Sequence, residues 1–190
     1  MCDSKNFYVW LLQVFALLGL LAFLLWLTLR PKNPTYTIVD FSAPTSNQSN
    51  NTSSENGAIS YVLEIQNPNK DSGIYYNDIL LTFYYGQDSV GEKTIPSFYQ
   101  GKHKTRQLSD HFDANARVWK ALRSTILNAT AELKVGLVTK IRYKMWGRKS
   151  KHHGMNLQGQ IRIGSDGKIS GKNKKIKLKH TSKRWRSRYD

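Results

Sequence analysis

Apolar residues occur in two patterns along the chain: one uninterrupted block near the start, and a series of alternating positions after it. The block covers residues 7–29, FYVWLLQVFALLGLLAFLLWLTL, and contains no charged residue. As a helix it would extend about 34 Å, which is enough to cross a hydrocarbon core. Trp10 and Trp26 lie towards its two ends, where interfacial aromatic residues are found. The block predicts a transmembrane helix behind a short N-terminus, residues 1–6.

A cleaved secretory signal is the alternative interpretation of this block. Such signals have an apolar core of about 7–15 residues, followed by small residues at the cleavage site. The chain instead continues as RPKNP after Leu29. We therefore favour an uncleaved single-pass anchor.

The alternating positions predict β-strands at residues 35–41, 59–65, 79–85, 133–145 and 155–163. In the longest run, LKVGLVTKIRYKM, the apolar residues share one parity with a single interruption at Thr139. Most of its lysines and arginines occupy positions of the other parity or lie at the ends of the run. A slip of one residue would move these cations into the core, so the register is strongly fixed.

Beyond the apolar block, a helical period occurs at residues 115–129. Apolar residues recur there at i, i+4 and i+8 from Val118, and Asp113 or Asn115 can cap the start. Short strands joined by Gly-, Pro- and Asn-rich turns, without alternation of strands and helices, predict a mainly β fold. We expect an antiparallel β-sandwich with one α-helix.

Charge is concentrated at the C-terminal end of the chain. Residues 1–138 contain 12 basic and 11 acidic residues, whereas residues 139–190 contain 17 basic and 2 acidic. A local excess of this kind indicates a surface for an anionic partner and says little about the fold.

Candidate catalytic chemistry is absent from the sequence pattern. Cys2 is the one cysteine, so no intrachain disulfide forms, although its position near the span permits palmitoylation. The five histidines show no metal-ligand spacing with Cys, Asp or Glu. We expect no enzyme activity, no metal and no cofactor.

Membrane orientation rests on candidate glycosylation sites, because positive charges on the two sides of the span nearly balance. Asn47, Asn50 and Asn51, in a loop rich in Asn and Ser, each begin an Asn-x-Ser/Thr sequon, and Asn128 begins a fourth. A short cytosolic N-terminus with everything after Arg30 outside the cell is the favoured arrangement.

The stretch NPNKDSGIYY, starting at Asn67, is either a binding site or a corner. Asn67 and Asn69 can bond to backbone two residues on, Pro68 fixes its own φ, and a glycine permits positive φ. These are the requirements of a corner, which is the favoured interpretation. The two adjacent tyrosines would point to opposite faces, so at most one belongs to the core.

This stretch, followed by YYGQDSVGEKTIPSFYQGKHKT, resembles the plant harpin-induced-like (non-race-specific disease resistance-like) membrane proteins with a late-embryogenesis-abundant type-two domain. The resemblance extends from residue 7 to about residue 168. Its most specific residues are Asn67, Pro68, Asn69, Ile74, Tyr75, Tyr76, Pro96, Phe98, Tyr99, Gln100 and Gly101.

The resemblance implies a Greek-key sandwich of fibronectin or immunoglobulin type at the plasma membrane or plasmodesmata, in proteins linked to defence and stress responses. It implies no chemistry. Relatives often carry a cysteine around Gly159, which this chain lacks. The expected organisation is a stalk, first strand and Asn/Ser-rich loop at residues 30–56, the rest of the sandwich at 57–167 and a basic tail at 168–190.

The basic tail is either a solvated, partly disordered extension or an anion-binding segment. Arginine forks and stacking aromatic rings suit phosphate, carboxylate and nucleic-acid bases equally well. Outside the cell, acidic wall polysaccharide or the outer leaflet would be the target, and we would not expect nucleic acid. The candidate residues are Lys174, Lys175, Lys177, Lys179, Lys183, Arg184, Trp185, Arg186 and Arg188.

Two functions follow. The favoured one is a membrane-anchored binding or adaptor protein that engages membrane or wall-associated partner proteins or acidic polysaccharide. The other is a structural tether whose basic tail docks electrostatically on an anionic surface, namely wall pectin, membrane lipid or RNA.

Overall fold

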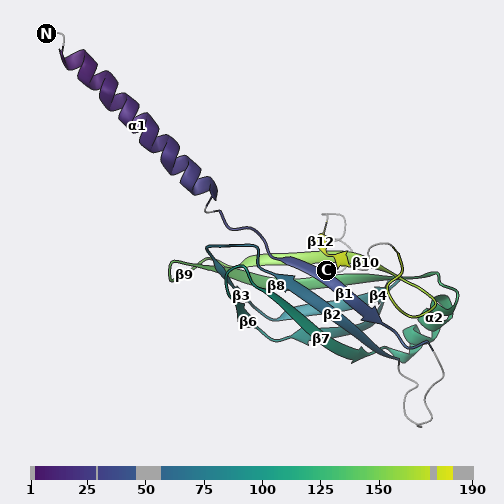
Figure 1. Ribbon diagram of the computed structural model, residues 1–190. Coiled ribbons are helices and arrows are strands. Elements are labelled where there is room, and N and C mark those ends of the chain that lie inside the picture. The colour runs from purple at the N-terminus through teal and green to yellow at the C-terminus, as the bar shows by residue number, and fades with distance from the viewer. Residues whose placement is uncertain (1–2, 29, 46–56, 172–174, 182–190) are drawn as a thin grey trace. The chain divides into compact units, whose positions relative to one another are not determined.

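The computed structural model describes residues 3–28, 30–45, 57–171 and 175–181, which fall into two units, Met1–Lys32 and Asn33–Asp190 (Figure 1). The first unit contains helix α1 (Asp3–Thr28). Its stretch Asn6–Trp26 has a mean hydropathy of 2.3 and is long and apolar enough to cross a membrane. The helix therefore begins a few residues before the predicted span and ends close to it.

The second unit is mainly β. Its elements are β1 (Thr35–Ser42), β2 (Ala58–Gln66), β3 (Gly73–Tyr76), β4 (Ile79–Tyr85), β5 (Asp88–Ile95), β6 (Phe98–Gln100), β7 (Thr105–Asp113), α2 (Ala116–Leu127), β8 (Ala131–Met145), β9 (Arg148–Lys149), β10 (His153–Ile163), β11 (Ile176–Lys177) and β12 (Lys179–His180). All five strands predicted from alternation are present, with ends shifted by one or two residues.

The strands form two antiparallel sheets. The first has the order β11-β1-β2-β7, and the second, of eight strands, contains the order β12-β10-β8-β3-β6. Strand β8 is long enough to pair with β10 along one edge and with both β4 and β3 along the other, while β4 also pairs with β5. Its predicted register is confirmed, since alternate residues from Ala131 to Tyr143 are buried.

Aromatic side chains join the two sheets. The ring centroid of Phe83 on β4 lies 5.9 Å from that of Phe41 on β1, 5.3 Å from Tyr61 on β2 and 4.9 Å from Phe112 on β7. Phe83 and Phe41 are fully buried. The sheets therefore pack face to face as a sandwich, with the core between their apolar faces.

Helix α2 covers one end of this sandwich (Figure 1). Asn115 caps it, because its Oδ1 accepts a hydrogen bond from the backbone N–H of Arg117, so Asp113 is not the cap. The predicted apolar face is buried, and the ring of Trp119 lies where a side chain at Gly57 would otherwise project. A residue with a Cβ at position 57 would displace this ring.

The predicted tail boundary at residue 168 is wrong, because part of the tail belongs to the sandwich. Strand β11 pairs with β1 and β12 pairs with β10, and between them Leu178 is buried and donates its N–H to the Tyr36 carbonyl at 2.9 Å. Gly159 makes room for Leu178, since a Cβ there would lie 2.5 Å from Leu178 Cδ2. The absence of a side chain at Gly159 therefore admits this segment.

We expect Leu178→Ala to lower the free energy of unfolding of residues 33–190 by about 2–3 kcal/mol, because it removes a buried side chain that holds the added strands. Urea unfolding measures the loss. Lys179→Ala is the control, since Lys179 is exposed, and we expect it to change stability by less than about 0.5 kcal/mol. Equal effects of the two changes would mean that the segment with β11 and β12 adds nothing to the stability of the sandwich.

Candidate functional site: an aromatic and basic end of the sandwich

The NPN triplet forms a buried, hydrogen-bonded corner between β2 and β3. Asn67 Nδ2 donates to the carbonyls of Ser72 and Gly101, both at 2.9 Å. Its Oδ1 accepts from the backbone N–H of Asn69 at 3.0 Å and from Asn69 Nδ2 at 2.9 Å. The bond to the backbone N–H two residues on confirms the predicted corner for Asn67. The bond to the Gly101 carbonyl ties the loop to the end of β6.

Gln100 connects the same corner to the core. Its Nε2 donates to the carbonyls of Ile65 at 2.9 Å and Lys104 at 2.7 Å, while its Oε1 accepts from the hydroxyl of Tyr76 at 2.9 Å. Burial raises the pKa of Tyr76 far above its ordinary value, so the hydroxyl stays protonated and continues to donate. This network fixes the position of β6 beside β3.

The two adjacent tyrosines point to opposite faces, as predicted. Tyr76 is 2% exposed, whereas Tyr75 faces outward, with its ring centroid 4.7 Å from that of Tyr99 on β6. The Tyr99 ring covers Gly73, where a Cβ would lie 2.3 Å from the Tyr99 hydroxyl oxygen. Glycine at this position therefore lets the ring lie flat on β3.

Basic side chains lie over these rings. Lys149 Nζ is 4.4 Å from the ring centroid of Tyr75, and Lys144 Nζ is 5.6 Å from that of Tyr99. On β7, in the other sheet, the Arg106 guanidinium lies 4.6 Å from the centre of the Phe98 ring. Cation–π contact orients each cation while leaving its N–H donors available to an anion.

A shallow groove of about 460 Å³ adjoins these rings. It is lined by Tyr75, Tyr76, Asn77, Asp78, Ser97, Phe98, Tyr99 and Arg142. Asp78 is already engaged, because its Oδ1 accepts the Ser97 N–H at 2.8 Å. Among the described residues, Arg142 Nε is buried without a hydrogen-bond partner. An arginine that lines a groove beside flat rings suits a ligand that carries a carboxylate or phosphate.

The resemblance motif therefore has two structural roles. Asn67, Asn69, Tyr76, Gln100 and Gly101 build the corner, and Ile74 is a core residue. Tyr75, Phe98 and Tyr99 line the groove, whereas Pro96 is exposed between β5 and β6, and Pro68 is half-buried in the loop.

The sequence did not identify the cations of this site. Arg142 and Lys144 were predicted only to lie on the polar face of a strand, and Lys149 was not predicted to have any role. Pairing of Tyr75 with both Tyr99 and Arg142 across three strands brings the groove residues together. The available signal was the Gly-containing turn after β8, which predicts a hairpin that returns Lys149 over this face.

The predicted glycosylation sites lie partly outside the described residues. Asn47, Asn50 and Asn51 fall in that part of the chain, whereas Asn128 is exposed at the end of α2. Glycosylation remains a prediction for all four.

The tail residues divide in the same way. Lys175, Lys177 and Lys179 are exposed beside the buried Leu178, whereas residues 172–174 and 182–190 are outside the described part of the chain. The latter include Lys174, Lys183, Arg184, Trp185, Arg186 and Arg188. An anion-binding role for the tail remains a prediction.

Metal chemistry has no visible basis within residues 3–28, 30–45, 57–171 and 175–181. There, no three His, Cys, Asp or Glu side chains gather closely enough to hold an ion. His152 and His153 are both exposed at the start of β10.

The chain is similar to known plant proteins over most of its length. The family model described as late embryogenesis abundant protein matches residues 62–159. Protein NDR1 of Arabidopsis thaliana is 32% identical over 171 residues, covering 85% of this chain and 76% of NDR1. NDR1/HIN1-like protein 26 of the same plant is 33% identical over 97 residues, covering 50% of this chain and 46% of that protein. The solution structure of AT1g01470 from Arabidopsis thaliana covers 71% of this chain and 85% of its own, with 14% identity and a TM-score of 0.44.

The chain has an apolar N-terminal helix followed in sequence by a mainly β domain of antiparallel sheets, which carries the hydrogen-bonded corner and the groove. This arrangement defines a class of β-sandwich proteins with an apolar N-terminal helix. Within that class, the chain belongs to the late embryogenesis abundant family and to its NDR1/HIN1-like members.

Proposed function

We propose that the chain is a single-pass membrane-anchored, non-enzymatic binding or adaptor protein of plant defence or stress responses. Helix α1 is the anchor, the sandwich lies outside the cell, and the protein acts at the plasma membrane or plasmodesmata. The relationship to NDR1 and the NDR1/HIN1-like proteins supports the defence or stress role. A Greek-key arrangement of fibronectin or immunoglobulin type is part of the same proposal.

The observation that carries the binding role is the groove at Arg142. Arg142 lines the groove beside the rings of Tyr75, Phe98 and Tyr99. A carboxylate bound in the groove would pair with its guanidinium. We propose an acidic wall polysaccharide as the ligand, since its uronic acids combine carboxylates with flat faces that pack on rings.

Arg142→Gln is expected to weaken binding of an oligogalacturonide to residues 33–190 by about 10- to 100-fold, because it removes a charge-assisted hydrogen bond. Isothermal titration measures this. Arg162→Gln is the matched control: Arg162 is on β10, its side chain is 81% exposed, and its 3.4 Å contact with Glu132 is of little energetic value. Polysaccharide binding in the groove is refuted if both variants lose affinity equally. It is also refuted if the wild-type protein binds an acidic peptide from a partner protein but no oligogalacturonide.

The structural tether is the second candidate, supported by the exposed lysines of the C-terminal segment. Lys175, Lys177 and Lys179 flank Leu178, which fixes them to the sandwich surface. Replacing Lys175, Lys177 and Lys179 with Gln in residues 33–190 separates the two functions. Binding that disappears in this variant and at high salt favours the tether, and binding that survives both favours the groove.

A further inference from the structure

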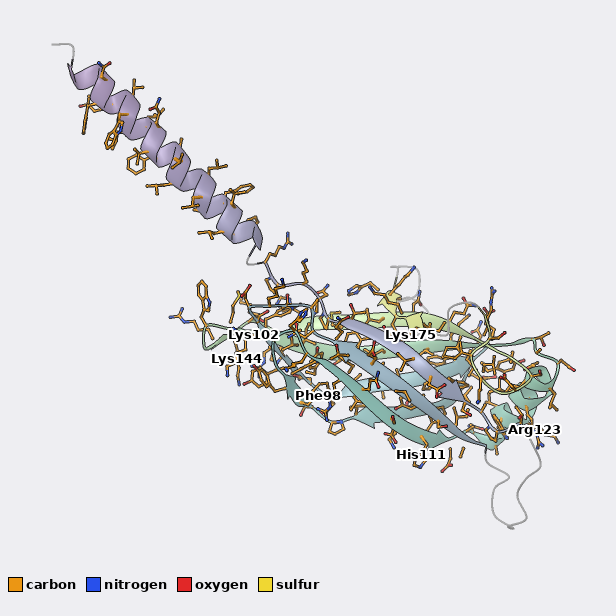
Figure 2. The ribbon with its side chains drawn as sticks, in the orientation of Figure 1. Phe98, Lys102, His111, Arg123, Lys144 and Lys175 are labelled. Atoms are coloured by element: carbon orange, nitrogen blue, oxygen red, sulfur yellow. The ribbon has the colours of Figure 1, made fainter. Side chains whose placement is uncertain are left out.

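Three segments that are distant in sequence, residues 67–72, 101–104 and 144–151, meet beside the start of β1 at the end of the sandwich opposite α2. Thr35 at the start of β1 pairs with Gln66, and Gln66 pairs with Thr105, so the loops beside these strand ends lie at one end. Gly73 pairs with Lys144, which places the β8–β9 hairpin there too. Figure 2 shows Lys102 and Lys144 at this end and Arg123 at the other.

This end is strongly basic. Its segments, residues 67–72, 101–104 and 144–151, are all described, and their one carboxylate is Asp71. Except for the half-buried Lys144, the cations are exposed. They are Lys70, Lys102, Lys104, Lys144, Arg148, Lys149 and Lys151. The surface is therefore complementary to a dense array of anions rather than to a single one.

A tryptophan projects from the tip of the β8–β9 hairpin. Trp146 is 81% exposed and occupies a two-residue turn with Gly147, with positive φ angles of 48° and 80°. Turns of this geometry favour Asn and Gly, and a bulky residue in the left-handed region is uncommon. An unfavourable conformation that also exposes an indole indicates a role for that indole.

Chain length restricts what this end can meet. The candidate span ends at Trp26, and residues 27–33 connect it to Asn33, whose Oδ1 accepts a 2.9 Å hydrogen bond from the Tyr143 hydroxyl. Tyr143 is on β8, just before the hairpin. At most about 25 Å of extended chain separates the end of the span from this point. If α1 crosses a membrane, the basic end is tethered close to that bilayer.

We propose that the basic end docks on the phosphate headgroups of the bilayer that α1 crosses. Trp146 enters the interfacial layer, where indoles are enriched, and Arg148, Lys149 and Lys151 bind phosphates around it. Trp146 distinguishes this surface from a polysaccharide site, because its indole stands on an exposed tip outside the groove of Arg142. The inference rests on α1 being the anchor, as proposed above. Docking would hold the sandwich in one orientation and turn the groove in a fixed direction relative to the membrane.

The test uses residues 33–190, which form a separate compact unit that contains all the buried core residues of the described part of the chain. Sedimentation with phosphatidylcholine vesicles containing about 30% phosphatidylglycerol measures binding at 0.1 M salt. We expect Trp146→Asn to reduce partitioning about tenfold while leaving unfolding unchanged or improved, because Asn suits the turn. Arg148→Gln with Lys151→Gln should reduce it about 25-fold, at about fivefold for each charge.

Arg117→Gln with Lys120→Gln is the matched control, since it removes two exposed charges from α2 at the other end. Equal losses in the two double variants, or no loss in Trp146→Asn, would overturn the docking surface. Binding to oligogalacturonide but not to vesicles would also overturn it. Carbonate extraction of membranes that contain the full-length chain tests the anchor separately. If carbonate releases the intact chain from the membrane, α1 is not an anchor. If the chain stays in the membrane but residues 33–190 do not bind vesicles, docking alone is refuted.

Discussion

Replacing Phe83 with alanine is expected to lower the free energy of unfolding of residues 33–190 by about 4 kcal/mol. Phe83 is fully buried, and its ring is within 6 Å of three rings, Phe41, Tyr61 and Phe112, that all belong to the other sheet. Truncation therefore opens a cavity between the sheets, where each ring loses contacts that neighbouring side chains cannot replace.

Urea unfolding measures this loss, and calorimetry should show the melting temperature falling by about 8–16 °C. Phe83→Leu keeps most of the volume and is expected to cost about 1–1.5 kcal/mol. A loss below about 1.5 kcal/mol for Phe83→Ala would contradict face-to-face packing of the sheets through this cluster.

Asn67→Ala is expected to cost about 3–4 kcal/mol, although it removes only an amide group. Asn67 is 1% exposed, and its side chain makes hydrogen bonds to Ser72, Gly101 and Asn69. Each buried group left without a partner costs about 1–3 kcal/mol. The bond to Gly101 also positions β6, so the backbone N–H of His103, which donates to the Asn69 carbonyl, should lose protection in hydrogen exchange.

Asn77→Ala is the control for this variant, because the Asn77 side chain is exposed and lines the groove of Arg142 instead of the corner. It should change stability by less than about 0.5 kcal/mol. If Asn67→Ala costs less than about 1 kcal/mol, the corner does not depend on its amide, and the NPN triplet must be explained by something other than structure.

Strands buried on one face could be predicted from the sequence, because burial imposes a period of two on their apolar residues. Strand β8 is the clearest case, with Ala131, Leu133, Val135, Leu137 and Ile141 all buried. The apolar alternation did not predict strands β5 and β7. Most of their residues are exposed or half-buried, so pairing with a neighbour, and not apolar alternation, makes them strands.

The corner could be predicted because its chemistry is local: an asparagine bonds to backbone two residues away. The groove could not, because it depends on contacts between strands. Tyr75 and Tyr99 are far apart in sequence, and Arg142 is farther still, and their proximity follows from the order β8-β3-β6. The tail was misjudged for the same reason, since the space beside Gly159 that receives Leu178 exists only in the folded sandwich.

In the proposed topology, α1 holds the sandwich outside the cell. Trypsin applied to intact protoplasts that express the full-length chain with a C-terminal epitope tag tests it most directly, since the C-terminal quarter is rich in lysine and arginine. We expect intact cells to lose the tag while a cytosolic marker survives. A tag that remains until detergent opens the membrane would refute this topology and place the sandwich in the cytosol.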